Sequence, residues 1–171
     1  TSAQLPVLEE GDVFLSNVNE ICRYLARKHN LLGNTADDNL RCDLAHELFD
    51  TAQTKLFDLY LDPAFFDKRS EFEGAELLDT LSQLESFFAE NQCESGFWVG
   101  EGITYIDILA WNYLDSVRPL RSSAVGKFKL LSQFKQRIQT RPNINAYLKS
   151  GRRPATLMLP LSVFGGTPET S

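Results

Sequence analysis

The stretch from Glu101 to Leu114 constrains the fold most, because it predicts a buried helix that carries its own start signal. Thr104 is placed to be the N-cap, with its hydroxyl accepting from the amide of Asp107. Asp107 is placed to accept from the amide of Thr104 in return, which makes a capping box. The residues that follow are almost all apolar, and a helix that is apolar nearly all round packs inside a protein. We therefore predict a structural role for Thr104 and Asp107.

Composition narrows the class of protein. The chain has 171 residues, 43% of them hydrophobic, which is ordinary for a globular protein of one domain or slightly more. A net charge of -6 with no basic stripe argues against nucleic acid as a partner. Apolar runs are too short to cross a bilayer, and we recognise no signal peptide, so we expect no membrane partner and a cytoplasmic location. The three cysteines and two histidines predict neither a disulfide framework nor a metal site.

The spacing of apolar residues predicts a mostly α-helical chain. Two short strands come first, the run up to Leu8 and the run from Val13 to Leu15, joined by a turn at Gly11. Apolar residues at steps of three and four then predict helices over residues 18–28, 35–60, 74–91, 104–117, 128–140 and 144–149. Either Ser16 or Asn17 is expected to cap the first of these helices. Residues 64–73 are expected to be irregular, and the residues after 151 to form a surface coil. A lone hairpin is marginal in water, so its strands are expected to need partners from outside this chain.

Four pieces of the sequence, in this order, resemble cytosolic glutathione transferases of the sigma/pi type. They are Gln4–Leu8, Ile21–Arg27 with Leu32–Gly33, Val99–Asp107 and Arg141–Leu148. The resemblance implies that residues 1–33 are the ββα remnant of a thioredoxin-like domain. It further implies that residues 34–150 form an all-α domain and residues 151–171 a tail. A βαβ unit of ~30 or more residues is then expected before this segment.

The resemblance also implies a glutathione site. The backbone of Leu5, next to a cis Pro6, is expected to pair with the cysteinyl part of glutathione, as a strand edge pairs with a peptide. Gln4 is expected to be the neighbouring polar contact. A plain turn before a strand is the alternative reading of these three residues.

Asn17 and Val18 fall where the family holds the γ-glutamyl carboxylate with a hydroxyl and with helix N-terminal amides. Valine has no hydroxyl, and the lost hydrogen bond to a charged group is worth about 1.5–3 kcal/mol. Sliding the motif by two residues places Ser16 and Asn17 there instead, at the cost of an insertion. Asp50 is expected to reach across a homodimer to the γ-glutamyl amine. A surface carboxylate paired with His46, one turn earlier, is the alternative.

For the second substrate, the resemblance implies an apolar cleft with candidates Phe49, Leu56, Tyr60 and Phe164. Apolar residues at helical spacing are more often plain core, which is the alternative for this set. The hydroxyl or thiol that activates the glutathione thiol is expected in the preceding segment, so we predict no catalytic residue in this chain. Glutathione is expected as co-substrate, with no other cofactor.

Two functions from different classes follow. The first is a glutathione transferase homologue, which adds the glutathione thiolate to a small hydrophobic electrophile or isomerises a peroxide-type lipid. This chain alone is expected to be inactive. The second is a non-catalytic module of the same fold used for protein–protein assembly, and Val18 favours it. A truncated product without selected function is a third reading.

Overall fold

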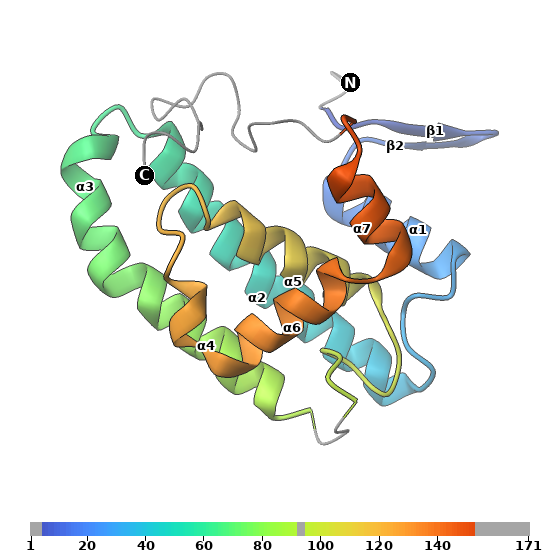
Figure 1. The fold of residues 1–171 in the computed structure, drawn as a ribbon. Coiled ribbons are helices and arrows are strands. Elements are labelled where there is room, and N and C mark those ends of the chain that lie inside the picture. The colour runs from blue at the N-terminus through green and yellow to red at the C-terminus, as the bar shows by residue number, and fades with distance from the viewer. Residues whose placement is uncertain (1–4, 92–94, 153–171) are drawn as a thin grey trace.

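The computed structural model describes residues 5–91 and 95–152 (Figure 1). The elements are, in chain order, β1 (Leu8–Glu10), β2 (Val13–Leu15), α1 (Val18–Lys28), α2 (Ala36–Leu61), α3 (Phe65–Glu71), the π-helical turn η1 (Phe72–Glu76), α4 (Leu77–Ala89), α5 (Tyr105–Ser116), the 3₁₀ turn η2 (Val125–Lys127), α6 (Lys129–Gln139) and α7 (Pro142–Lys149). The predicted mostly α-helical class is confirmed.

The hairpin and α1 lie together at one end of the molecule (Figure 1). β1 and β2 are antiparallel, with Leu8 opposite Leu15 and Glu10 opposite Val13. Gly11 turns the chain between them with a φ of +57°, a conformation that glycine adopts without steric cost. The peptide bond between Leu5 and Pro6 is cis, as predicted.

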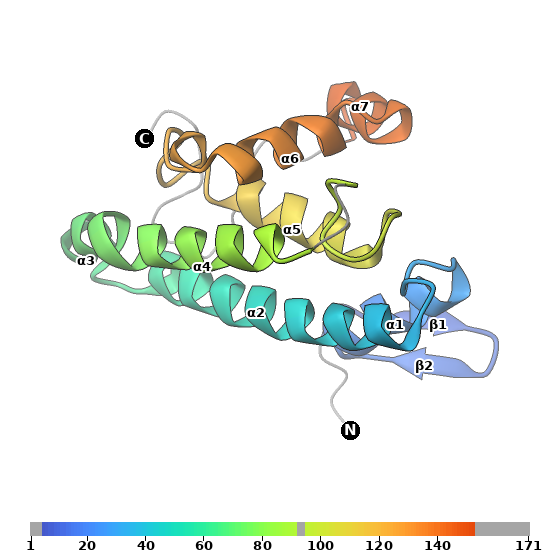
Figure 2. The same ribbon diagram turned by 90° about the horizontal axis from the view of Figure 1, so that it is seen from below.

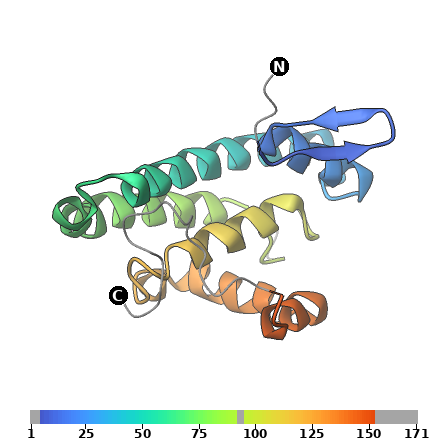
Figure 3. The same ribbon diagram turned by 90° about the horizontal axis from the view of Figure 1, so that it is seen from above.

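Helix α5 lies at the centre of the packing, in contact with α1, α2 and α6. Figures 2 and 3 show α4 and α5 as a layer between α2 and α6. Trp98 is fully buried in this core, with its ring 4.7 Å from that of Phe49 and 5.8 Å from that of Phe134. Within residues 5–91 and 95–152, we find no helix whose length and apolarity suit a membrane span.

The capping box predicted for the central helix is present. The amide of Thr104 donates to Asp107 Oδ2 at 2.7 Å, and the Thr104 hydroxyl donates to the same oxygen at 3.0 Å. Asp107 Oδ1 accepts from the amide of Trp98 at 3.1 Å, so the box also holds the preceding loop. The helix is not buried all round, because Ile108 is 47% exposed.

The prediction of irregular structure over residues 64–73 is wrong. The chain there forms α3 and then a π-helical turn that runs without a break into α4. Contacts from distant residues stabilise this segment, since Phe65 is fully buried and Arg69 Nη2 donates to the carbonyl of Leu120 at 2.8 Å. Gly74 suggested a helix start, but it lies inside the π-helical turn. Single-turn π-helical insertions of this kind are rare and leave no clear mark on apolar spacing.

Two glycines of the loop before α5 are expected to respond to alanine in opposite directions. Gly100 has a φ of +55°, and an added Cβ would lie 3.0 Å from Asp38 Oδ1. Gly102 lies outside the left-handed region and has no atom within 4 Å of an added Cβ. We expect Gly100→Ala to lower the free energy of unfolding by about 1–2 kcal/mol. Gly102→Ala should raise it by about 0.4–1 kcal/mol, because alanine restricts the unfolded chain. Urea denaturation measures both, and equal shifts would contradict the assigned backbone conformations.

Candidate functional site

The N-terminus of α1 presents one free donor group. Asn17 caps the helix, with Oδ1 accepting from the amides of Asn19 at 2.9 Å and Glu20 at 3.2 Å. The amide of Ile21 donates to the carbonyl of Asn17 at 2.9 Å. Among the first four amides of α1, as the structure describes them, only that of Val18 is not engaged by Asn17. Helix N-termini bind anions through such amides.

This end of α1 opens onto a cavity of about 210 Å³ between three helices, which we call the α1–α2–α5 pocket. Its lining consists of Val18, Asn19 and Cys22 from α1, His46, Phe49, Asp50, Gln53 and Phe57 from α2, and Leu109, Asn112 and Tyr113 from α5. The α2 residues share one side of that helix through steps of three and four. The pocket thereby brings together three residues singled out from the sequence, namely Val18, Phe49 and Asp50.

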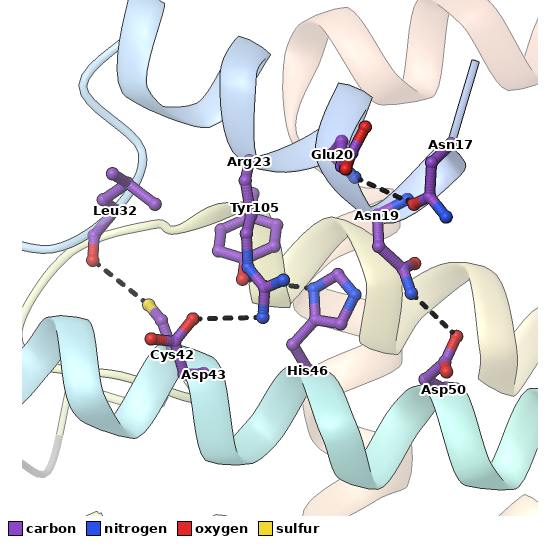
Figure 4. Close-up of polar contacts among 10 residues, drawn as sticks. All are labelled: Asn17, Asn19, Glu20, Arg23, Leu32, Cys42, Asp43, His46, Asp50 and Tyr105. Carbon is purple, nitrogen blue, oxygen red and sulfur yellow. Dashed lines mark hydrogen bonds and ion pairs between the residues drawn. The ribbon is translucent and has the colours of Figure 1, made fainter. Parts of the chain in front are cut away.

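Polar side chains form one wall of the pocket (Figure 4). His46 is only 4% exposed, and its Nδ1 lies 3.1 Å from the hydroxyl of Tyr105. Asn19 Nδ2 donates to Asp50 Oδ1 at 3.3 Å. Beyond them, Arg23 forms an ion pair with Asp43 at 3.2 Å.

A second cavity, of about 440 Å³, adjoins this wall. It is lined by Asn19, Arg23, Asp43, Leu44, His46, Glu47 and Asp50. Asn19, His46 and Asp50 border both cavities. Typical small-molecule sites measure ~300–1,000 Å³. The first cavity is smaller than this range and can hold only part of a ligand, whereas the two cavities together fall within it.

Burial favours the neutral forms of three titratable groups at or next to the pocket, His46, Tyr105 and Cys22. Burial lowers the pKa of His46, and the nearby positive charge of Arg23 lowers it further. Burial raises the pKa of Tyr105 to about 12 and raises the pKa of the Cys22 thiol. At neutral pH the pocket lining therefore offers the imidazole of His46 and the thiol of Cys22 next to Asp50, and the Tyr105 phenol lies outside the lining, bonded to His46.

The lowered pKa of His46 predicts a pH dependence of stability. The unfolded chain takes up the His46 proton at a higher pH than the folded chain, so acidification below about pH 6.5 favours unfolding. We expect His46→Gln to remove this component while the exposed His29→Gln keeps it. Urea midpoints at about pH 7.5 and about pH 5.5 measure the difference. A pH dependence that is the same in both variants would contradict the prediction.

Other residues singled out from the sequence lie elsewhere. Leu5 and Pro6 precede β1, exposed, and neither lines the pocket. Leu56 and Tyr60 are buried between α2 and the rest of the core, where the Tyr60 hydroxyl donates to the carbonyl of Ser116 at 2.9 Å. They do not line the pocket either. Gln4 and Phe164 fall outside the described residues.

The structure also shows site residues that the sequence did not single out. Asp50 is bonded to Asn19 and not to His46, which was its suggested partner. His46 forms a hydrogen bond with Tyr105 of α5 instead. From the sequence, Tyr105 is predicted only as part of a buried helix. The sequence signal for these site residues is their spacing on α2. His46 lies four residues before Asp50 and Gln53 three after it, which places all three on one side of the helix.

Comparisons with known proteins agree with this architecture. The family model described as "Glutathione S-transferase, C-terminal domain" matches residues 53–151. Glutathione S-transferase Mu 1 of Mus musculus is 32% identical over 152 residues, which cover 89% of this chain and 67% of that protein. Glutathione S-transferase 2 of Gallus gallus is 34% identical over 148 residues, 86% of this chain and 65% of that protein.

The same family appears among solved structures. The Pi-class glutathione S-transferase of Onchocerca volvulus superimposes with a TM-score of 0.80 at 28% identity, covering 85% of this chain and 70% of that one. This chain spans about two thirds of the length of the relatives. Because a family model covers more than half of the chain and relatives align with most of it, the chain belongs to the glutathione S-transferase family.

Proposed function

We propose that this chain supplies the all-α domain and part of the glutathione site of a glutathione transferase. In that reaction the glutathione thiolate adds to a small hydrophobic electrophile. The proposal assigns residues 1–33 to a thioredoxin-like domain, residues 34–150 to the all-α domain and residues 151–171 to a tail. The observation that carries it is the α1–α2–α5 pocket, which joins Val18, Asp50 and Phe49 in one cavity.

The proposal assigns protein groups to the γ-glutamyl and cysteinyl parts of glutathione. The γ-glutamyl carboxylate lies at the N-terminus of α1, next to Asn17, where the Val18 amide donates to it. Asp50 accepts from the γ-glutamyl ammonium, in this subunit or across a homodimer. The backbone of Leu5, beside Pro6 and Gln4, pairs with the cysteinyl part.

The second substrate lies against apolar groups. Phe49 contacts it from the pocket lining, and Leu56, Tyr60 and Phe164 are the further candidate contacts. Sigma-type isomerisation of a peroxide-type lipid belongs to the same proposal, since it also needs an apolar cleft beside glutathione. We place the protein in the cytoplasm.

We propose further that the chain alone does not conjugate glutathione. Activating the thiol requires a donor that stabilises the thiolate. Among the described residues that line the pocket, Tyr113 carries a phenol and Cys22 a thiol, and burial raises the pKa of both, which disfavours such a role. About a third of each relative lies outside its match with this chain, which leaves room for the activating group there.

Calorimetry and a coupled assay test this function. The isolated chain should bind glutathione but show no turnover with glutathione and a nitro-aryl chloride. Measurable turnover would contradict the inactivity of the chain alone. Absence of glutathione binding would contradict the proposed site.

One observation favours a second function, a non-catalytic module for protein–protein assembly. Val18 is 50% exposed at the helix N-terminus and has no hydroxyl, so the site lacks one donor for glutathione. A version of the protein that includes the remaining third of its relatives' length distinguishes the two functions. Retention on a glutathione column supports the transferase, and passage without retention supports the assembly module.

A further inference from the structure

Acidic and basic side chains are segregated along this chain. Residues 1–115 carry 22 acidic and seven basic side chains, whereas residues 116–168 carry ten basic side chains and no acidic one. The net charge of -6 therefore combines a strongly acidic part with a basic one, which the total alone does not show. An asymmetry of this kind is typical of proteins that contact a membrane surface or a nucleic acid.

The fold places the basic part in one outer layer of the molecule. Helices α6 and α7 lie on one side of the layer formed by α4 and α5, and α2 lies on the other side (Figures 2 and 3). The buried residues of α6 recur at steps of three and four, which leaves its cations exposed. We call the exposed cations of this layer the α6–α7 cationic surface; they are Lys127, Lys129, Arg137, Arg141, Lys149 and Arg152.

The charges of this surface are available to a partner. Among the residues that the structure describes, none of the six cations forms an ion pair. Asp115 and Glu85 approach the layer from other helices, and both are engaged. Asp115 is buried and pairs with Lys135 at 3.5 Å, while Glu85 accepts from the amide of Leu130 at 2.6 Å, at the start of α6.

The acids of α2 lie too far away to cancel this positive charge. Packed helices lie ~8–10 Å apart, so α2, on the far side of the α4–α5 layer, is ~16–20 Å from α6. Interactions between exposed charges are screened over ~8 Å at physiological ionic strength. A partner that contacts α6 and α7 is therefore attracted by the local positive charge, although the whole chain is negative.

The arrangement of the surface favours a lipid bilayer among anionic partners. The cations are spread along two helices of 11 and 8 residues, which suits a partner as broad as the layer itself. Tyr147 is 41% exposed, and the guanidinium of Arg152 lies 5.8 Å from the centre of its ring. Tyrosine and arginine both combine an apolar body with a polar end, which suits the boundary between lipid and water.

The sequence next to this surface is apolar. The chain leaves the described part at Arg152, and residues 154–161 contain no charge and include Leu157, Met158, Leu159 and Leu161. Stable attachment to a bilayer takes an apolar group in addition to a basic patch. A nucleic acid or an acidic protein segment needs only the basic patch, so this pairing of signals favours lipid.

We propose that the α6–α7 cationic surface binds the anionic surface of a lipid bilayer. Peripheral binding needs no spanning helix, so it replaces the expectation of no membrane partner, which rests on the length of apolar runs. A protein of the cytoplasm has access to such a surface, because the cytoplasmic leaflet carries anionic lipids. The α1–α2–α5 pocket takes no residue from α6 or α7, so failure of this inference leaves the proposed function untouched.

Cosedimentation of the full chain with vesicles tests the attraction. Vesicles of phosphatidylcholine and phosphatidylserine in equal parts should bind the chain, and added salt should weaken the binding by screening the charges. Vesicles of phosphatidylcholine alone should bind little. No binding to the anionic vesicles, or equal binding to both kinds, would overturn the inference.

Paired variants test whether the α6–α7 cationic surface is the contact. Lys129→Gln together with Lys149→Gln should weaken binding to the anionic vesicles about 25-fold, at about fivefold for each cation near the lipid. The matched control, Arg27→Gln together with Lys55→Gln on α1 and α2, changes the net charge equally and should bind as the wild type does. All four residues are exposed, so the circular dichroism spectra should agree. Equal losses in both variants would overturn the assignment to α6 and α7.

Hydrogen exchange locates the contact independently of any substitution. No residue of α7 is buried, so its amides open readily and should exchange more slowly when anionic vesicles are present. The amides of α2 should exchange at the same rate with and without vesicles. Slower exchange in α2 and not in α7 would place the lipid on the other side of the molecule and overturn the inference.

Competition separates lipid from other polyanions. A DNA duplex of mixed sequence and polyglutamate each offer negative charge without an apolar phase. At the ionic strength at which the vesicles bind, neither probe at an equal concentration of charge should displace the chain from them. Displacement by the duplex or by polyglutamate would overturn the choice of lipid and identify that polyanion as the better partner.

Discussion

Asp107→Ala is expected to lower the free energy of unfolding by about 3–9 kcal/mol, because three donors in the core lose their acceptor at about 1–3 kcal/mol each. Those donors are the amide and hydroxyl of Thr104, at 2.7 and 3.0 Å, and the amide of Trp98, at 3.1 Å. Asp107 is 0% exposed, so water cannot replace the carboxylate without opening the core. The same carboxylate starts the central helix and fixes the loop that carries Trp98. We therefore expect the loss to reach the whole domain, as measured by urea denaturation.

A second capping box on the same chain is the matched control. Asp38 accepts from the amides of Asn34 at 2.9 Å and Thr35 at 3.0 Å at the start of α2. This box lies near the surface, and the backbone hydrogen bond from Asn34 lowers the pKa of Asp38, whereas burial raises that of Asp107. Asp38→Ala should cost only about 0.5–2 kcal/mol, because water can satisfy the freed amides. Similar losses of unfolding free energy in the two variants would show that burial of a capping box does not determine how much it stabilises the protein.

The contrast between these boxes and α3 shows how much of the fold the sequence predicts. Caps and apolar spacing are local, so the start of α5 and the bounds of α1 follow directly from residues that are close in sequence. The helix over Phe65–Glu71 depends on the burial of Phe65 and on the bond from Arg69 to Leu120. No local pattern records a contact across 51 positions of the chain.

The candidate site divides in the same way. Val18 and Asp50 were identified through the family resemblance, and the pocket brings them together. Its polar wall depends on the bond between His46 and Tyr105, which are 59 positions apart, and on the bond between Asn19 and Asp50, which are 31 apart. Sequence spacing placed His46 beside Asp50 on α2, but it could not show that α1 and α5 supply the hydrogen-bonding partners of both. Those partners orient each group.

Val18→Ser should increase the affinity of the chain for glutathione by about 10- to 100-fold. The hydroxyl adds one hydrogen bond to the γ-glutamyl carboxylate, a bond worth about 1.5–3 kcal/mol, and each 1.4 kcal/mol corresponds to a factor of ten. Val18 is half-exposed at the first position of α1, so serine fits without repacking. Calorimetric titration with glutathione measures the gain.

Val18→Ala is the control for that gain, because alanine differs from serine only by the hydroxyl. If the valine side chain limits access to the helix N-terminus, both variants gain the same affinity for glutathione. In that case the backbone amide of residue 18 alone binds the carboxylate. If the hydroxyl is the missing donor, serine gains and alanine does not. If neither variant binds glutathione, the missing hydroxyl at residue 18 is not the reason for the lack of binding. The assembly module is then the better-supported function. The side chain at one helix N-terminus thus decides between an enzyme's binding site and an adaptor of the same fold.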